Sequence, residues 1–190
     1  MRKVLYILSC LNDDDAAWLA ANGATRRPGD GEVVIQEGVA IDKLFIVLSG
    51  ALGVRLANGE TVATLGAGEV VGEIAFVDSA PPSATVAAIS RAVLLEIDKA
   101  KLQGKIDADP GFAARFYKAI AVFLASRLRA TTHRLGYGKT GDLESARVLA
   151  DEIDSNVLDR VSDAGERFNR LLRALDAGTP TAGEARRGDS

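Results

Sequence analysis

Histidine and cysteine are almost missing from this sequence, since one residue of each occurs among 190. A single cysteine excludes an internal disulfide, and the two residues together are too few for a zinc site of cysteine and histidine ligands. Metal-dependent enzymes whose ion is held by several histidines are excluded for the same reason. Beside His133 there is no pattern of a nucleophile with an acid–base partner. We therefore predict a protein that is not an enzyme and needs no cofactor or metal.

Long hydrophobic runs are also missing. The longest, Ala119–Ala125, is far too short to span a bilayer, so no membrane partner is expected. The N-terminus has the order of a lipoprotein signal, with Met1–Lys3 basic, Val4–Leu8 apolar and Cys10 close behind. This apolar stretch is shorter than the minimum of about seven residues, and Asp13–Asp15 follow at once. We therefore expect a cytoplasmic protein whose N-terminus packs on the domain as a short lead-in.

Positive charge is not in excess, because the formal net charge is −3 at pH 7. Domains that bind nucleic acid usually carry a basic stripe, so a nucleic-acid partner is not expected. Acidic residues outnumber basic ones from Asp142 to Leu175, where they would repel phosphate groups. Leu149–Ile153 resembles the start of a helix-turn-helix unit, but Asp154–Asn156 stand where its turn needs a glycine.

Glycine, in contrast, is abundant, with 19 residues. It supplies the positive φ of tight turns, which favours a turn-rich β fold over a helical bundle. Short apolar or alternating runs lie between these turns, and the Asn58–Gly59 pair is a strong hairpin signal. Runs of this length and spacing predict a β-sandwich or barrel. The predicted strands are residues 32–36, 44–48, 52–56, 61–65, 83–89 and 93–97.

Helical signals flank this β region. Asn12 is a suitable N-cap for a helix whose first turn holds Asp13–Asp15, where negative charge is favourable. After the strands, an Asp-Pro pair starts a long helix over residues 109–135. Its apolar stripe repeats every three or four residues, and Gly136 and Gly138 are expected to end it. The stripe consists of Phe116, Ile120, Phe123, Leu124, Leu128, Thr131 and Leu135.

We divide the chain into three parts. Residues 1–138 form one domain that includes the long helix. Residues 139–177 form a C-terminal helical segment, because an amphipathic pattern begins at Asp142 and continues to Leu175. A protein partner is expected to bind over residues 142–175. Residues 178–190 are rich in Gly, Thr, Ala and charge, and are predicted to be disordered.

One stretch in the middle of the chain has the composition of a ligand site. Gly72 permits a close approach of the backbone. Glu73–Phe76 has the pattern of one short helical turn, whose free N–H groups suit an anion. The Glu73 carboxylate only accepts hydrogen bonds and can grip a pair of hydroxyls. Ser83 adds a hydroxyl at the far end of the following loop. Together these residues would hold a small anion that bears a sugar.

Several motifs of this sequence resemble motifs that occur together in one known family. Gly72–Ala75, a loop and then Pro81–Val86 resemble the phosphate-binding cassette of cyclic-nucleotide-binding domains. That family includes the bacterial catabolite activators and the regulatory subunits of cAMP-dependent kinase. Pro28–Gly38 and Leu44–Gly50 resemble its early strands. The resemblance runs from about Leu11 to Gly138. It implies a mainly β jelly roll with flanking helices, followed by a long helix and a C-terminal helical segment.

The resemblance also implies ligand-binding roles. In the family the glutamate at the position of Glu73 binds the ribose 2′-hydroxyl. Gly72 and Ala84 match a cassette glycine and a loop amide that meet the cyclic phosphate, and Ser83 matches a serine that does the same. The implied ligand is a cyclic mononucleotide, cyclic AMP or cyclic GMP.

The long helix would complete this site. In the catabolite activators, two adjacent hydroxyl residues of that helix contact the purine, one of them from the partner subunit. Thr131 and Thr132 match these two positions. The same resemblance implies a bacterial homodimer that pairs through residues 112–135, although packing of this helix on its own jelly roll is the alternative.

Pro82 is a departure from the family pattern. It stands where the family has the arginine that pairs with the cyclic phosphate, and proline has neither charge nor N–H. Arg91 or Arg127 could supply the cation from elsewhere. Three interpretations follow: weak binding of a cyclic mononucleotide, binding of another ligand such as a cyclic dinucleotide, or a fold that binds no nucleotide.

Each candidate residue also has a structural interpretation. Glu73 could cap a helix or pair on the surface, and Ser83 could simply open a strand. Thr131 and Thr132 could fill positions near a helix end. Our leading hypothesis is a regulatory sensor module that transmits its ligand state through the C-terminal helices. The competing hypothesis, which Pro82 favours, is a ligand-free scaffold that uses its helices for oligomerisation.

Overall fold

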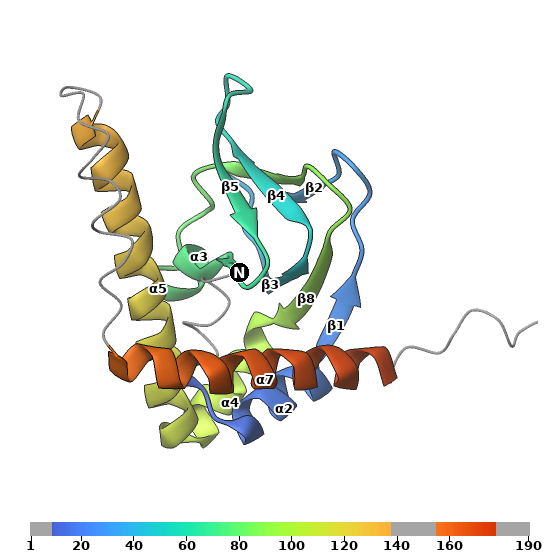
Figure 1. Cartoon of the computed structure of the whole chain (residues 1–190). Coiled ribbons are helices and arrows are strands. Elements are labelled where there is room, and N and C mark those ends of the chain that lie inside the picture. The colour runs from blue at the N-terminus through green and yellow to red at the C-terminus, as the bar shows by residue number, and fades with distance from the viewer. Residues whose placement is uncertain (1–8, 138–154, 178–190) are drawn as a thin grey trace, which may run out of the picture.

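The computed structural model describes residues 9–137 and 155–177. Within these ranges, the strands form two four-stranded antiparallel sheets with helices gathered at one end (Figure 1). The first sheet contains, in spatial order, β1 (Gly23–Arg26), β8 (Val93–Asp98), β3 (Lys43–Ser49) and β6 (Val70–Val71). The second contains β2 (Val33–Ile35), β7 (Thr85–Ala88), β4 (Ala51–Arg55) and β5 (Thr61–Gly66). The predicted mainly β jelly roll with flanking helices is confirmed.

β3, in the middle of the first sheet, is buried on both faces. Its central residues, Leu44–Leu48, are all buried. Successive strand residues point to opposite faces, so Leu44 and Ile46 pack with the helices while Phe45 and Val47 pack against the second sheet. An uninterrupted apolar run is therefore what this position requires. The edge strand β5 of the second sheet differs, because Leu65 is its only buried residue.

The helices form a base and one long side of the molecule. α2 (Asp13–Asn22), α4 (Lys99–Ala108) and α7 (Ser155–Ala177) lie at the base, and α5 (Pro110–Tyr137) runs from there along the side of the sheets (Figure 1). α3 (Glu73–Val77) is a short helix that follows β6 after one residue. Leu19, Leu102 and Phe112 bring three of these helices into one buried cluster with β3 and β8.

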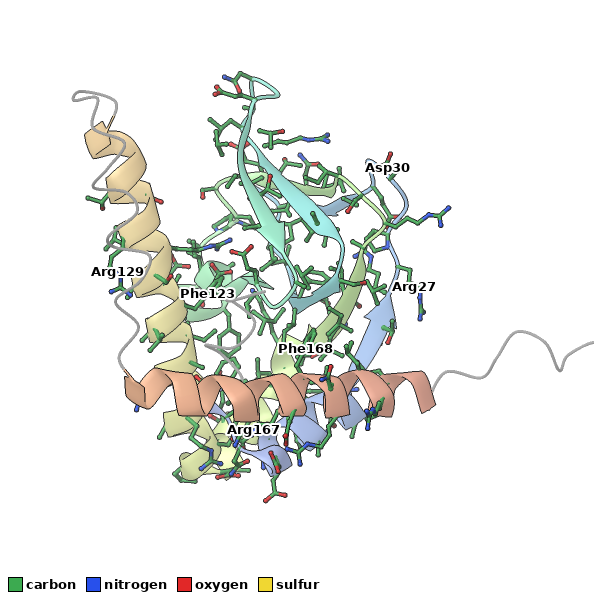
Figure 2. The ribbon with its side chains drawn as sticks, in the orientation of Figure 1. Arg27, Asp30, Phe123, Arg129, Arg167 and Phe168 are labelled. Atoms are coloured by element: carbon green, nitrogen blue, oxygen red, sulfur yellow. The ribbon has the colours of Figure 1, made fainter. Side chains whose placement is uncertain are left out.

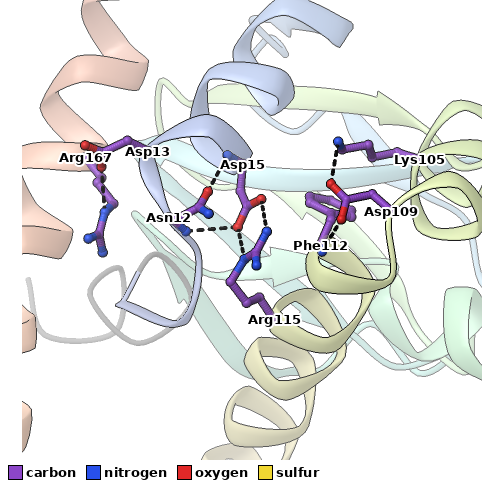
Figure 3. A network of polar contacts seen from close by, with 8 residues as sticks. All are labelled: Asn12, Asp13, Asp15, Lys105, Asp109, Phe112, Arg115 and Arg167. Atoms are coloured by element: carbon purple, nitrogen blue, oxygen red, sulfur yellow. Dashed lines mark hydrogen bonds and ion pairs between the residues drawn. The ribbon is translucent and has the colours of Figure 1, made fainter.

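The start of α2 is tied to α5 by a buried carboxylate (Figure 3). Asn12 accepts a hydrogen bond from the Asp15 N–H at 2.8 Å, and Asp15 accepts one from the Asn12 N–H at 2.9 Å. This reciprocal pair is a capping box. Asp15 is only 2% exposed, and its two oxygens also accept from Arg115 of α5 at 2.6 and 2.8 Å. One residue therefore caps one helix and anchors another.

α7 packs back on α2 of its own chain. Ala164 and Leu171 are buried in the cluster that holds the base together. Asp13 of α2 accepts hydrogen bonds from Arg167 and Arg170 of α7, each at 2.8 Å (Figure 3 shows the first). The apolar face that the sequence assigned to a protein partner is thus covered by the chain itself, at least over residues 164–175. Residues 142–154, the other part of that segment, lie outside the described residues.

α5 is buried over its first half only. Phe112, Phe116 and Ile120 belong to the core, whereas Leu128 is 69% exposed. The predicted apolar stripe is therefore core at one end and surface at the other; the side chain of Leu135 lies outside the described residues. None of the helices in the described part of the chain, α5 included, combines the length and the apolar content needed to cross a membrane.

The predicted boundaries need three changes. β1 and β6 were not predicted, because Gly23–Arg26 has no apolar alternation and β6 has only two residues. The expectation that Gly136 ends the long helix is wrong, since α5 continues to Tyr137. A glycine inside a helix costs only about 1 kcal/mol and does not by itself stop the helix. Gly138 and the tail over 178–190 lie outside the described residues.

Candidate functional site

A cavity of about 480 Å³ opens between the second sheet, α3 and α5. Its volume lies within the range of about 300–1,000 Å³ that small-molecule sites occupy. Apolar side chains from both sheets form its floor, and the loop from Asp78 to Ala84 forms one wall. The floor includes Ile35, Val54, Leu65, Val71 and Val86. The predicted residues Gly72, Glu73, Ser83, Ala84 and Thr131 all line this cavity, and Thr132 is not among its lining residues.

Gly72 is fixed by the protein's own backbone. It has φ of +88° and is the N-cap of α3. A Cβ at this position would lie 2.9 Å from Ile41 Cδ1 and 3.1 Å from the Lys43 carbonyl oxygen. The close approach that the sequence indicated is therefore an approach to β3, and it places α3 at the edge of the cavity. Gly72 still borders the cavity, where its backbone is open to a ligand.

Glu73 and Arg127 form a buried ion pair that joins α3 to α5. The Glu73 side chain is 1% exposed, and its Oε1 accepts a hydrogen bond from Arg127 Nη1. Burial raises the pKa of Glu73 above its usual range, and Arg127 opposes that rise. The negative charge of Glu69 adds a smaller upward effect on the same pKa. The idea that Glu73 pairs on the surface is therefore wrong in one respect, because the pair lies in the cavity wall.

Arg127 has a second contact on its own helix. Its guanidinium carbon lies 4.8 Å from the centre of the Phe123 ring, a cation–π geometry. Phe123 lies on the side of α5 that faces the sheets, and Arg129 lies on the opposite side (Figure 2). The Arg127 side chain remains 28% exposed, so it is held at the mouth of the cavity and not deep within it.

The loop that carries Ser83 offers few hydrogen-bond donors. Pro81 and Pro82 line the cavity and have no N–H. The carbonyl of Pro82 accepts a hydrogen bond from the Gly38 N–H at 2.8 Å, which ties this loop to the turn after β2. Asp78 accepts from the Ala80 N–H at 2.9 Å and closes the turn on the other side. Ser83 and the backbone N–H of Ala84 are the donors of this wall that the ligand proposal uses.

The two threonines of α5 differ in their positions. The Thr131 hydroxyl donates to the Arg127 carbonyl oxygen at 3.0 Å, and the Thr132 hydroxyl donates to that of Leu128 at 2.9 Å. Both side chains are exposed. Thr131 faces the cavity, one helical turn beyond Arg127, whereas Thr132 lies outside it. The structure thus brings one of the two predicted purine contacts to the site.

The charges around the cavity are mostly negative. Arg127 is the only cationic residue among the described residues that line it, against the carboxylates of Glu69, Glu73 and Asp78. Arg91, the other cation considered from the sequence, is exposed and does not line the cavity. Glu69 was missed altogether, because its position just before a two-residue strand gives no sequence signal of a site. Over the described residues, no group of histidine, cysteine and acidic side chains could hold a metal ion.

Comparison with known proteins finds one matching family and several relatives. Residues 26–109 match the family described as "Cyclic nucleotide-binding domain". Over 179 residues the chain is 29% identical to a cAMP-dependent protein kinase regulatory subunit of Blastocladiella emersonii, covering 90% of this chain and 42% of that one. It is 30% identical over 129 residues to Glutaminase 2 of Bradyrhizobium diazoefficiens, covering 68% of this chain and 20% of the glutaminase. The chain therefore spans less than half the length of these curated relatives.

The fold has close counterparts among solved structures. A cyclic nucleotide-binding domain from Methylobacillus flagellatus superposes with a TM-score of 0.65 at 20% identity, over 74% of this chain and 85% of that one. At this identity the likeness concerns the fold alone. The similarity to the glutaminase is confined to a fifth of that enzyme, so it carries no argument that this chain is catalytic.

Proposed function

Because residues 26–109 place this chain in the cyclic nucleotide-binding domain family, we propose that it is a cytoplasmic sensor that binds cyclic AMP or cyclic GMP. Domains of this family act as regulatory modules and not as catalysts, as in the kinase regulatory subunit that the chain resembles. The sensor would report its ligand state through α5 and the C-terminal helices. The observation that supports this proposal most strongly is the Glu73–Arg127 pair. It joins α3 to α5 in the wall of one cavity, so a ligand bound there would lie against both helices.

The cavity offers a partner for each part of a cyclic mononucleotide. Glu73 accepts hydrogen bonds and is placed for the ribose hydroxyl. Ser83 and the Ala84 N–H lie together in the wall that the loop of residues 78–84 forms. Thr131 projects from α5 toward the same cavity and suits the polar edge of a purine. Apolar residues of the floor would cover the base and the sugar ring.

Transmission requires the ligand to bind one arrangement of the helices more tightly than another. A nucleotide that contacts both α3 and α5 meets this requirement, because it fixes the distance between the cassette and the helix. α5 carries Leu128 on its exposed outer half. We propose that this half pairs with a second copy of the chain, which would bring Thr132 toward the partner's cavity. The outer face of α7 is then the surface left for a protein partner.

The first test is isothermal titration of the whole protein with cyclic AMP, cyclic GMP and cyclic di-GMP. Ser83→Ala and Thr131→Val each remove one hydrogen bond to the ligand and should weaken binding by about two- to tenfold. Ser49→Ala is the matched control, because Ser49 is exposed at the end of β3 and outside the cavity. Micromolar binding that both cavity variants weaken would support the sensor.

The alternative is a scaffold that keeps the fold without a ligand. It is favoured by Pro82 and by the single cation of the cavity, which is already paired. No heat with any of the three nucleotides, together with no shift of the melting temperature, would establish this alternative. Preferential binding of cyclic di-GMP would instead assign the cavity to a cyclic dinucleotide.

A further inference from the structure

Arg127 has two competing partners in the cavity, the Glu73 carboxylate and an anionic ligand. If the proposed function holds, the ligand is an anion and needs a cation in the cavity. The only cation among the described lining residues is Arg127, and it is bound to Glu73. We propose that Arg127 binds the phosphate of the ligand, and that it does so by leaving Glu73, which takes up one proton from solvent. Ligand binding is then an exchange of partners at Arg127, coupled to protonation of Glu73.

The charge of the site points to Arg127. The wall formed by residues 78–84 contains two prolines without N–H groups, and the charged residues that line the cavity outside α5 are acidic. Ser83 and the Ala84 N–H can donate hydrogen bonds to a phosphate, but neither carries charge. A guanidinium carries five donors in a fixed fork that matches phosphate oxygens. The anion is therefore drawn toward α5 rather than toward the proline-rich loop.

The geometry determines which member of the pair moves. Glu73 is fully enclosed at the start of α3, where the backbone conformation of Gly72 holds the helix in place. Arg127 is long, 28% exposed and at the mouth of the cavity, with the Phe123 ring beneath its guanidinium. The guanidinium can turn toward a phosphate and stay on this ring. The ring contacts one flat face of the guanidinium, and the N–H donors at its edge remain available.

Glu73 cannot remain charged once Arg127 has left. A buried carboxylate without a counter-ion takes up a proton instead of bearing the cost of desolvation. The charged groups that face it are Arg127 from α5 and Glu69 from the turn before β6, and Glu69 repels a second negative charge. Asp78, at the end of α3, is a further carboxylate of the same cavity. Protonated Glu73 can both donate to and accept from a ligand hydroxyl.

The exchange predicts proton uptake that titration calorimetry detects. Titrations of the whole protein with cyclic AMP and cyclic GMP in buffers of different ionisation enthalpy should show up to one proton taken up for each ligand bound. Affinity should rise as pH falls, by at most about tenfold per pH unit for a one-proton linkage. A nucleotide that binds with no proton uptake and no pH dependence at any pH at which the protein is folded would overturn the exchange while leaving the proposed function in place.

Two variants separate the exchange from a simple ribose contact. Glu73→Gln keeps a side-chain acceptor, frees Arg127 and removes the titration, so it should bind nucleotide more tightly than the wild type at neutral pH, with no proton uptake. If Glu73 acted only as a charged acceptor for the ribose, this variant would bind more weakly. Arg127→Gln should weaken binding about ten- to a hundredfold, and Arg127→Lys should recover part of that loss. Arg129→Gln is the control, because Arg129 lies on the opposite side of α5 (Figure 2).

The outcomes can be told apart. Thermal melts first establish that each variant is folded. If Glu73→Gln binds nucleotide at neutral pH and the wild type does not, the exchange stands and the proposed function at that pH fails. If neither binds at any pH, both fail. If Arg127→Gln binds as well as Arg129→Gln does, another group holds the phosphate and the exchange is wrong.

Discussion

Gly72 determines where the cavity begins. Its φ of +88° lies in the region that side chains disfavour by about 1–2 kcal/mol, and a Cβ would crowd the Lys43 carbonyl. We expect Gly72→Ala to lower the free energy of unfolding by about 2–3 kcal/mol, measured in urea. Gly38→Ala is the control, because Gly38 also has positive φ but nothing within 4 Å of its Cβ position. Its cost should be about 1–2 kcal/mol, and equal costs at the two sites would show that the crowding is unimportant.

Glu73 should make stability depend on pH in an unusual direction for a carboxylate. Its pKa is raised in the folded protein by burial, above the value of 4.5 of an exposed glutamate. The folded state therefore holds this proton at pH values where the unfolded chain has lost it. The contribution is complete below pH 4.5 and is lost as the pH rises through the folded pKa.

The comparison of wild type with Glu73→Gln isolates this effect. Unfolding in urea at several pH values should show the wild type losing stability relative to the variant as the pH rises above about 4.5. The glutamine does not titrate, so the rest of the protein cancels in the difference. Two curves that run parallel over this range would mean that the ion pair with Arg127 fully offsets the burial.

At the scale of single residues, the sequence predicted which residues line the cavity better than it predicted which side chains contact each other. Gly72, Glu73, Ser83 and Ala84 lie within one short stretch, so a local motif was enough to bring them to the same cavity. Arg127 was named only as one of two candidate cations for the phosphate and not as the partner of Glu73, because it is 54 residues away and reaches Glu73 only through the placement of α5. Thr131 faces the cavity of its own chain and Thr132 does not, because adjacent helical residues point in different directions. The contact of Thr132 with a partner subunit stays a prediction.

Among the helices, Asp15 connects two that are far apart in the sequence. It caps α2 and receives two hydrogen bonds from Arg115 of α5. Asp15→Ala removes the cap and leaves Arg115 without its partner, so we expect a loss of about 2–4 kcal/mol in the free energy of unfolding. Asp14→Ala, in the same helical turn but exposed, should change stability by less than about 0.5 kcal/mol. Similar losses for both would mean that only the charge near the helix start matters.

α7 should behave as part of the domain core. Leu171 is 3% exposed in the cluster that α7 shares with α2 and α5. We expect Leu171→Ala to cost about 2–4 kcal/mol and to lower the melting temperature, whereas Arg173→Ala, on the exposed side, should not. An unchanged melting temperature for Leu171→Ala would mean that α7 is not held against α2 in solution.

An amphipathic pattern in the sequence does not show what covers the apolar face of a helix. The sequence indicated that residues 142–175 contain an amphipathic helix, and α7 is one over Ser155–Ala177. Its apolar face was assigned to another protein, because periodicity shows that a face is buried without showing what buries it. The apolar run of β3 was easier to interpret, because a strand between two layers is buried on both faces and needs an unbroken apolar run.

For the whole molecule, the open question is what covers the outer half of α5. We expect a dimer in sedimentation velocity, formed through the outer half of this helix, where Leu128 is exposed. Leu128→Glu should shift the protein toward the monomer, because it places a charge in the middle of the proposed contact. Val39→Glu, an equally conspicuous exposed position outside α5, should leave the association unchanged. A wild type that sediments as a monomer would contradict the pairing.

The overall fold was predictable because many weak signals agreed. Glycine turns, short strands and an Asp-Pro helix start all favour one architecture. The relation between the two ends of the chain was not predictable, since contacts such as Asp13 with Arg167 join residues 154 apart. No local pattern carries that information.

This long-range contact has a consequence for how the protein is made. Domains are synthesised from the N-terminus, and a helix leaves the ribosome before a partner that lies later in the chain. α2 leaves the ribosome well before Arg167, Phe168 and Leu171, because Arg167 lies 154 residues after its partner Asp13. Until then the face of α2 that α7 covers stays open in the nascent chain. The apolar part of that face is covered only when α7 emerges.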